Sequence, residues 1–150
     1  MEKTRALYII VEGQTDAQIL HTLLECSKYE NVYHIPSGGY GNLSSMARTI
    51  RLMKSPNEDN DKILVVFDSD SEKEDVIEDR LATMRYLTGA EYDRRIGIFC
   101  FAPNIEKSLF PSEKFERKEI SEDLVNYMKE HIEELRANDV IREMQKFIDK

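Results

Sequence analysis

The chain has 150 residues, of which 41% are hydrophobic and 33% are charged, and its formal net charge is −8 at pH 7. This length and apolar content fit one globular domain with a core, and they exclude a chain too polar to fold. The acidic excess argues against a protein that holds nucleic acid by a general basic surface, but not against an enzyme that binds it through metal ions and a local basic strip.

The two cysteines, Cys26 and Cys100, stand far apart in the sequence. They form no C-x-x-C pair and cannot make a zinc site alone, so we expect two buried thiols in a reducing compartment. No apolar stretch is long enough to span a bilayer, and the short run before Glu12 does not have the form of a signal peptide. The sequence therefore predicts a cytoplasmic protein that does not associate with a membrane.

Four short apolar runs predict strands at residues 7–11, 32–35, 63–67 and 96–101. Three of the runs are nearly continuous, which is typical of strands buried on both faces of a parallel sheet. Apolar residues at helical spacing follow the first three runs. Thr15 and Ser71 each begin a capping-box pattern, and Gly89 is suited to ending the third helix. The alternation predicts an α/β, Rossmann-like fold with a mostly parallel four-stranded sheet flanked by helices and connected by right-handed crossovers.

The C-terminal part of the chain has two further helical patterns. Ser121 can cap the first, and Asn138 or Asp139 can begin the second. We expect residues 1–110 to form the catalytic core and residues 111–150 to form a helical extension that packs on it, within one domain overall. Alternatively, one of these apolar stripes is a docking face for a second chain.

Acidic residues follow three of the four predicted strands: Glu12 after the first, Asp68 and Asp70 after the third, and Glu106 after the fourth, with Asp16 shortly after Glu12. Because ligands of open parallel sheets bind outside the carboxyl ends of the strands, these acids could converge there. Several carboxylates close together repel one another, and a divalent cation removes that repulsion. Oxygen ligands without Cys or His favour Mg²⁺, Mn²⁺ or Ca²⁺ over zinc.

Each of these features also has a purely structural interpretation. Asp68 could cap the following helix, and Asp16 and Glu106 could be first-turn acids favoured by the helix dipole. The glycine-rich segment 37–41 is either a flexible loop or a loop whose backbone N–H groups approach a phosphate. The functional interpretation is favoured because all these features appear in order at the ends of the predicted strands.

Two of these motifs resemble the hallmarks of the Toprim domain, a fold that topoisomerases, primases and OLD-family nucleases share. The hallmarks are Glu12-Gly13 after the first strand and Asp68-Ser69-Asp70 after the third. The segments 11–16, 37–42 and 103–106 are similar to features of the OLD-like branch. The resemblance covers the chain from about Leu7 to Glu106.

The resemblance implies a metal-dependent nuclease that hydrolyses phosphodiesters of DNA or RNA. It implies that Asp68 and Asp70 hold one Mg²⁺ or Mn²⁺ ion, and that Glu12, Asp16 and Glu106 hold or orient a second. Glu12 could instead act as a general acid or base. The predicted contacts to phosphate come from Gly38, Gly39, Gly41 and Lys107, with Lys114, Arg117 and Lys118 as further basic candidates.

The 150 residues carry no ATPase segment, unlike a full OLD protein. The resemblance therefore implies a separate ATPase partner and a role in antiphage defence, and it is compatible with a homodimer. The alternative is a non-catalytic Toprim module that binds a protein or nucleic acid as a scaffold. A phosphatase of the haloacid dehalogenase kind and a receiver domain are disfavoured, because the first needs its Asp-x-Asp after strand one and the second needs an acidic pair where Gly13 stands.

Overall fold

A computed structural model describes residues 5–53, 61–110 and 122–150 of the chain. Its centre is a four-stranded sheet with the strand order β2-β1-β3-β4, and all three pairs of neighbouring strands are parallel. The strands are β1 (Ala6–Val11), β2 (Asn31–Pro36), β3 (Lys62–Asp68) and β4 (Ile96–Phe101). The predicted α/β, Rossmann-like architecture is thus confirmed, and each predicted strand lies within a residue of its observed bounds.

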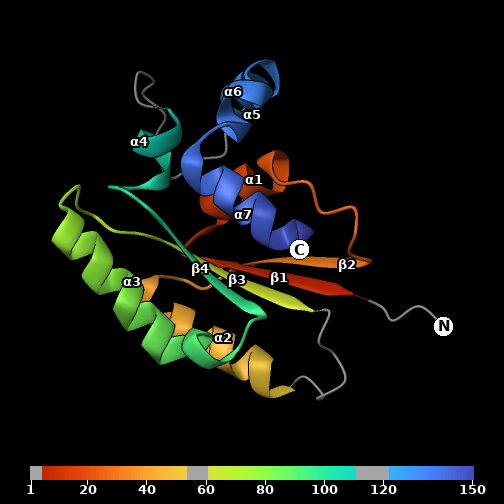
Figure 1. The fold of residues 1–150 in the computed structure, drawn as a ribbon. Coiled ribbons are helices and arrows are strands. Elements are labelled where there is room, and N and C mark those ends of the chain that lie inside the picture. The colour runs from red at the N-terminus through yellow and green to blue at the C-terminus, as the bar shows by residue number, and fades with distance from the viewer. Residues whose placement is uncertain (1–4, 54–60, 111–121) are drawn as a thin grey trace.

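Helices cover both faces of the sheet (Figure 1). The helices α2 (Leu43–Met53) and α3 (Glu74–Thr88) lie on one face, and α1 (Gln14–Leu23) and α7 (Asp139–Asp149) lie on the other. The remaining helical segments are α4 (Ile105–Leu109), α5 (Glu122–Glu130), α6 (Ile132–Arg136) and the short 3₁₀ turns η1 (Tyr40–Asn42) and η2 (Ala90–Tyr92). Within the described ranges, no helix combines the length and the apolar character needed to cross a membrane.

The near-continuous apolar runs arise because the inner strands are buried on both faces. In β3, Leu64 and Val66 pack with α1 and α7, whereas Ile63, Val65 and Phe67 pack with α2 and α3. Successive side chains of a strand point to opposite faces, so a strand covered on both sides needs an apolar residue at nearly every position. This burial explains why the two central strands could be found from the sequence.

Two predicted helix starts are wrong by a few residues. The first helix begins at Gln14, with Gly13 in an extended conformation at the cap position, and the Gly13 N–H donates to the Asp16 carboxylate. Asp16 is therefore part of the helix start, and Thr15 lies inside the helix. The third helix begins at Glu74, because the Ser71 hydroxyl accepts a hydrogen bond from the Lys73 N–H and so forms a turn before the helix.

Two other predicted helix boundaries are confirmed. Gly89 ends α3 with φ of 78°, a left-handed conformation that glycine adopts without strain. The side chain of Asn138 accepts hydrogen bonds from the N–H groups of Val140 and Ile141 at the start of α7. The predicted cap Ser121 lies outside the described residues.

The C-terminal helices share one apolar core with the sheet. Their buried residues belong to the same cluster as Leu7 and Ile9 of β1; these residues are Leu124, Met128, Leu135, Ile141, Met144 and Ile148. The buried Lys62 at the start of β3 donates to the carbonyl oxygens of Phe147 and Ile148, so the sheet also holds the end of α7. The division of the chain at residue 110 stays a prediction, since residues 111–121 lie outside the described part.

Candidate metal centre

The strand order determines where a site can form. β1 lies between β2 and β3, so the chain leaves β1 towards one side of the sheet and returns to β3 on the other. In open parallel sheets, such a reversal opens a crevice at the carboxyl ends of the two central strands. Glu12 directly follows β1, and Asp68 is the last residue of β3. Two of the predicted site residues therefore lie at this position.

Three acidic side chains converge at this edge. Asp16, Asp68 and Glu106 each offer a carboxylate oxygen, and these oxygens all lie within 4.8 Å of one another. Asp16 comes from the first turn of α1, Asp68 from the end of β3 and Glu106 from the first turn of α4. Asp16 and Asp68 are buried, and Oδ1 of Asp16 and both carboxylate oxygens of Glu106 are shielded from solvent. We call these three residues the acidic cluster.

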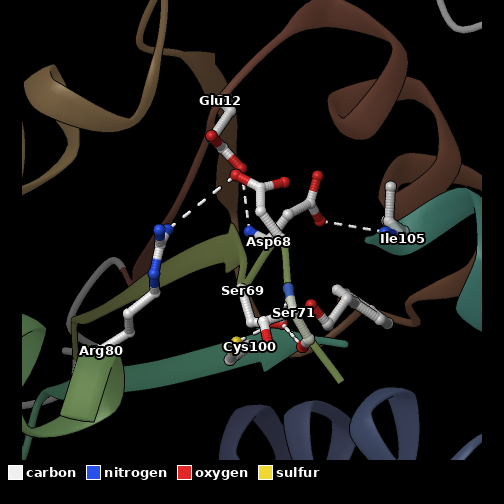
Figure 2. Close-up of polar contacts among 9 residues, drawn as sticks. Glu12, Asp68, Ser69, Ser71, Arg80, Cys100 and Ile105 are labelled. Atoms are coloured by element: carbon white, nitrogen blue, oxygen red, sulfur yellow. Dashed lines mark hydrogen bonds and ion pairs between the residues drawn. The ribbon is translucent and has the colours of Figure 1, made fainter. Parts of the chain in front are cut away.

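Backbone groups hold Asp68 in place (Figure 2). Its Oδ1 accepts a hydrogen bond of 2.9 Å from the N–H of Ile105, and its own N–H donates to Oε2 of Glu12 over 2.9 Å. Beyond the strands, the Ser69 N–H donates to the Phe101 carbonyl oxygen at 3.0 Å. The pairing of β3 with β4 therefore continues past the last strand residue and fixes the approach of Asp68 to α4.

Local hydrogen bonds also position the other two members. Oδ2 of Asp16 accepts from the Gly13 N–H at 3.1 Å. Asn104 caps α4 by accepting a hydrogen bond of 2.8 Å from the Lys107 N–H. This cap places Glu106 in the first turn of α4, close to Asp68. Each acid of the cluster is therefore set by the start of a helix or the end of a strand, and none depends on a long surface loop.

The donor set fits a hard divalent cation. All three members are carboxylates, and neither a cysteine nor a histidine belongs to the group. Three like charges at this spacing repel, and a divalent ion converts the repulsion into attraction. Carboxylate oxygens are the ligands that Mg²⁺, Mn²⁺ and Ca²⁺ prefer. Asp16, Asp68 and Glu106 could therefore hold a metal ion, as the sequence predicted for these three residues.

No protein-family model, curated protein or solved structure matches this chain. The resemblance to Toprim domains therefore stays a prediction from the two sequence motifs.

Glu12 and Asp70 do not belong to the three-residue cluster. One oxygen of Glu12 is bonded to the Asp68 N–H. Asp70 has a positive φ of 56°, its N–H donates to the Pro103 carbonyl oxygen, and its side chain is 62% exposed. The left-handed backbone at Asp70 turns the chain directly after Asp68, so the Asp-x-Asp pair does not continue as a strand. The predicted roles of Glu12 and Asp70 as metal ligands stay predictions.

The glycine-rich loop packs against the end of β1. The N–H groups of Gly38 and Gly39 both donate to the Glu12 carbonyl oxygen at 3.1 Å. In this conformation the two N–H groups bind the backbone of Glu12. The prediction instead had them donate to a phosphate. A cleft of about 410 Å³, lined by residues 12–16 with Gly38 and Gly39, opens beside the loop.

The other predicted phosphate contacts are not placed at the acidic cluster by any observed bond. Gly41 and Lys107 are both exposed, so each is accessible to a ligand. Lys114, Arg117 and Lys118 lie outside the described residues. All these contacts stay predictions.

No motif in the sequence singled out Arg80, which the structure brings to the site from α3. Its Nη1 lies 3.9 Å from Oδ2 of Asp70, and its guanidinium carbon lies 5.4 Å from the centre of the Tyr40 ring. Arg80 comes ten positions after Asp70, and its helix carries charged residues on several sides. Arg80 lies near the acidic edge because of the direction in which α3 leaves the sheet.

Cys100 lies on β4 next to Ser69 (Figure 2). Burial is the largest cause that raises the pKa of its thiol to about 11, and the carboxylates of Asp68 and Glu12 add to the increase. The thiol therefore stays protonated at neutral pH and is a poor nucleophile. Burial likewise raises the pKa of Cys26 to about 11. Both cysteines are free thiols, and both are partly buried, whereas the sequence had predicted buried thiols.

Proposed function

We propose that this chain is a metal-dependent nuclease of the Toprim, OLD-like type, which hydrolyses phosphodiester bonds of DNA or RNA. The observation that carries the proposal is the convergence of Asp16, Asp68 and Glu106 at the carboxyl edge of a parallel sheet, with their oxygens within 4.8 Å of one another. This arrangement agrees with the motifs that resemble the Toprim family. Mg²⁺ is the expected ion, with Mn²⁺ as a substitute, and two ions are expected by the same resemblance.

The residues have distinct roles in this proposal. Asp16, Asp68 and Glu106 would hold the metal, which when bound supplies positive charge for the phosphate and for the attacking water. Glu12, fixed through its Oε2 by the Asp68 N–H, would accept a proton from that water. The water oxygen bonds to phosphorus, the bond from phosphorus to one ester oxygen breaks, and the leaving oxygen takes up a proton.

The charge of the edge supports a role for a cation. A phosphodiester carries a negative charge, and the acidic cluster would repel it from the position where it must react. Bound divalent ions reverse the sign of the local potential. The carboxylates then hold the ions, and the ions attract the negatively charged substrate. The net charge of −8 is therefore compatible with a nucleic-acid substrate.

The experiment is a cleavage assay on fluorescent DNA and RNA, single- and double-stranded, with Mg²⁺, with Mn²⁺ and with EDTA. The wild-type chain should cut at least one substrate only with metal. Asp68→Asn keeps the acceptor for the Ile105 N–H but loses the charge, and it should lower the rate by at least about 100-fold. Glu91→Gln, at an exposed position of η2, is the matched control and should cut normally.

Cleavage that persists at the wild-type rate in both Asp68→Asn and Asp16→Asn would contradict the proposal. Metal binding without cleavage of any substrate would favour the alternative, a non-catalytic module that binds nucleic acid or a partner protein as a scaffold. If the protein neither binds metal nor cleaves any substrate, the acidic cluster is not the proposed site. The separate ATPase partner, the homodimer and the role in antiphage defence are further parts of the proposal that follow from the resemblance alone.

A further inference from the structure

Arg80 brings a positive charge to an edge dominated by carboxylates. It comes from the second turn of α3, its side chain is 35% exposed, and it extends towards Glu12 and Asp68 (Figure 2). On one side its guanidinium lies over the ring of Tyr40, at 5.4 Å from the ring centre. On the other side its Nη1 lies 3.9 Å from Oδ2 of Asp70.

These two contacts leave the hydrogen-bonding capacity of Arg80 largely unused. A guanidinium has five N–H donors, and the distance of 3.9 Å to Asp70 is too long for a hydrogen bond. Among the residues that the structure describes, the Arg80 guanidinium makes no hydrogen bond, and its contacts are those with Asp70 and Tyr40. Asp70 is also 62% exposed, and ion pairs of this kind contribute little to stability. The position of Arg80 is therefore poorly explained by folding alone.

Arg80 and the acids act on the same neighbouring groups. The Coulombic effect of Arg80 lowers the pKa of the Cys100 thiol, whereas Asp68 and Glu12 raise it. At Tyr40, Arg80 likewise lowers the pKa of the phenol and Glu12 raises it, although burial is the largest cause of its net increase. The guanidinium is thus close enough to the Cys100 thiol and the Tyr40 phenol to affect the pKa of each, and the acids of this edge affect the same two groups.

Tyr40 holds the guanidinium in a defined place. Its ring packs edge-on against Phe67 of β3, with the ring centres 5.6 Å apart, and its backbone belongs to η1 in the glycine-rich loop. A cation stacked on an aromatic face keeps its N–H groups in the plane of the guanidinium, directed away from the ring. Tyr40 therefore links the loop, β3 and α3 at the point where a ligand would meet Arg80.

We propose that Arg80, supported by Tyr40, forms a phosphate-binding subsite next to the acidic cluster, which takes the non-bridging oxygens of a nucleic-acid phosphodiester. The guanidinium has the planar fork that matches two oxygens of a phosphate, and its two present contacts are weak enough to be exchanged. This inference rests on the proposed nucleic-acid substrate. It adds the cation that would draw the substrate to a strongly acidic edge.

The experiment measures binding rather than cleavage. A short fluorescein-labelled single-stranded DNA is titrated with protein by fluorescence anisotropy, with Ca²⁺ in place of Mg²⁺ to suppress hydrolysis, at several concentrations of KCl. The affinity of Arg80→Ala should fall at least about tenfold. The slope of log K against log salt should decrease by about 0.7, which corresponds to one lost phosphate contact on a single strand.

Matched variants separate a phosphate contact from a structural role. Arg80→Lys keeps the charge without the fork, so it should retain most of the salt slope with weaker binding. Arg85→Ala removes an exposed arginine of the same helix and should bind as wild type does. Tyr40→Phe keeps the ring and should bind normally, whereas Tyr40→Leu should weaken binding. Circular dichroism and thermal melting verify that each variant is folded.

Failure of this inference and failure of the nuclease proposal give different results. A wild-type chain that binds no oligonucleotide, or an Arg80→Ala protein with unchanged affinity and salt slope, would overturn the subsite even if the protein cleaves nucleic acid. Arg80-dependent binding without any cleavage in Mg²⁺ would support the subsite and contradict the proposed hydrolysis.

Discussion

Oε2 of Glu12 accepts a hydrogen bond of 2.9 Å from the backbone N–H of Asp68. The residue that follows β1 thus holds the last residue of β3, and the carbonyl oxygen of the same Glu12 receives the N–H groups of Gly38 and Gly39. Glu12 therefore connects the ends of two strands with the glycine-rich loop. Any change at Glu12 should affect both the stability of this edge and the position of Asp68.

Glu12→Ala should lower the free energy of unfolding by about 1–3 kcal/mol, because the Asp68 N–H loses its acceptor. Glu12→Gln retains an amide oxygen that can accept the same hydrogen bond, so it should cost clearly less. Urea denaturation followed by circular dichroism measures both values. Equal stability of Glu12→Ala and wild type would show that the hydrogen bond has no net effect on the fold.

Amide substitutions in the acidic cluster should have opposite effects with and without metal. Asp16→Asn, Asp68→Asn and Glu106→Gln each remove one negative charge, so metal-free variants should be no less stable than wild type unless an existing hydrogen bond is lost. Wild type should melt at a higher temperature with Mg²⁺ or Mn²⁺, and the variants should lose most of that increase.

Calorimetric titration with Mn²⁺ measures the same effect as an affinity, which should fall at least about tenfold in each cluster variant. Glu91→Gln at the exposed η2 position is the control and should bind as wild type does. If neither Mg²⁺ nor Mn²⁺ raises the melting temperature of the wild-type protein, the three acids do not form a metal centre.

Much of the sheet could be predicted from sequence because burial on two faces leaves a strong pattern. β1 and β3 need apolar side chains on both sides, and their runs are nearly continuous. The first residues of the helices were harder to predict, because a cap is a single local hydrogen bond that several residues can supply. The pattern at Thr15 predicted a cap, whereas the Asp16 carboxylate meets the N–H of Gly13.

The candidate site could be predicted only where it coincides with strand ends. Asp68 is the last residue of β3, and Glu106 lies in the first turn of α4, the helix that follows β4, so the parallel pairing of β3 with β4 brings them together. The sequence could not show that the chain turns at Asp70 with a positive φ, because Asp tolerates that conformation without a distinctive neighbour. Arg80 was also missed, since its place depends on the direction of α3.

Stability should decrease as the pH falls from about 6.5 to about 4, in part because of His34. Burial, and to a lesser extent His21, lowers the pKa of His34 from 6.5 to about 4. The unfolded chain therefore binds a proton in this window that the folded chain does not, so folding loses free energy as pH falls through it. Allowing for partial exposure, the loss from this group should be about 1–2 kcal/mol.

Urea denaturation of wild type and His34→Leu at pH 7 and pH 5 measures that contribution. The variant should show a smaller decrease between the two values. His21→Ala should retain most of the decrease, because burial is the larger cause of the shift. An identical pH dependence in wild type and His34→Leu would contradict the assignment to His34.

Asn138 should contribute to stability through both ends of its side chain. Its Oδ1 caps α7, and its Nδ2 donates to the Ser108 hydroxyl at 3.2 Å, on the same helix, α4, that carries Glu106. Asn138→Ala should lower the free energy of unfolding by about 1–2 kcal/mol. Asn138→Asp keeps the cap and loses only the donor, so it should be intermediate by the same denaturation measurement, and no loss in Asn138→Ala would show that the cap is dispensable.

A crystal of the protein soaked in Mn²⁺ would reveal whether Asp16, Asp68 and Glu106 share a cation. Anomalous diffraction near the manganese absorption edge locates the ion without reference to activity. We predict a peak within bonding distance of a carboxylate oxygen of each of the three residues, and its loss in a crystal of Asp68→Asn. A fully soaked wild-type crystal with no peak between these carboxylates would show that the three residues hold no common ion.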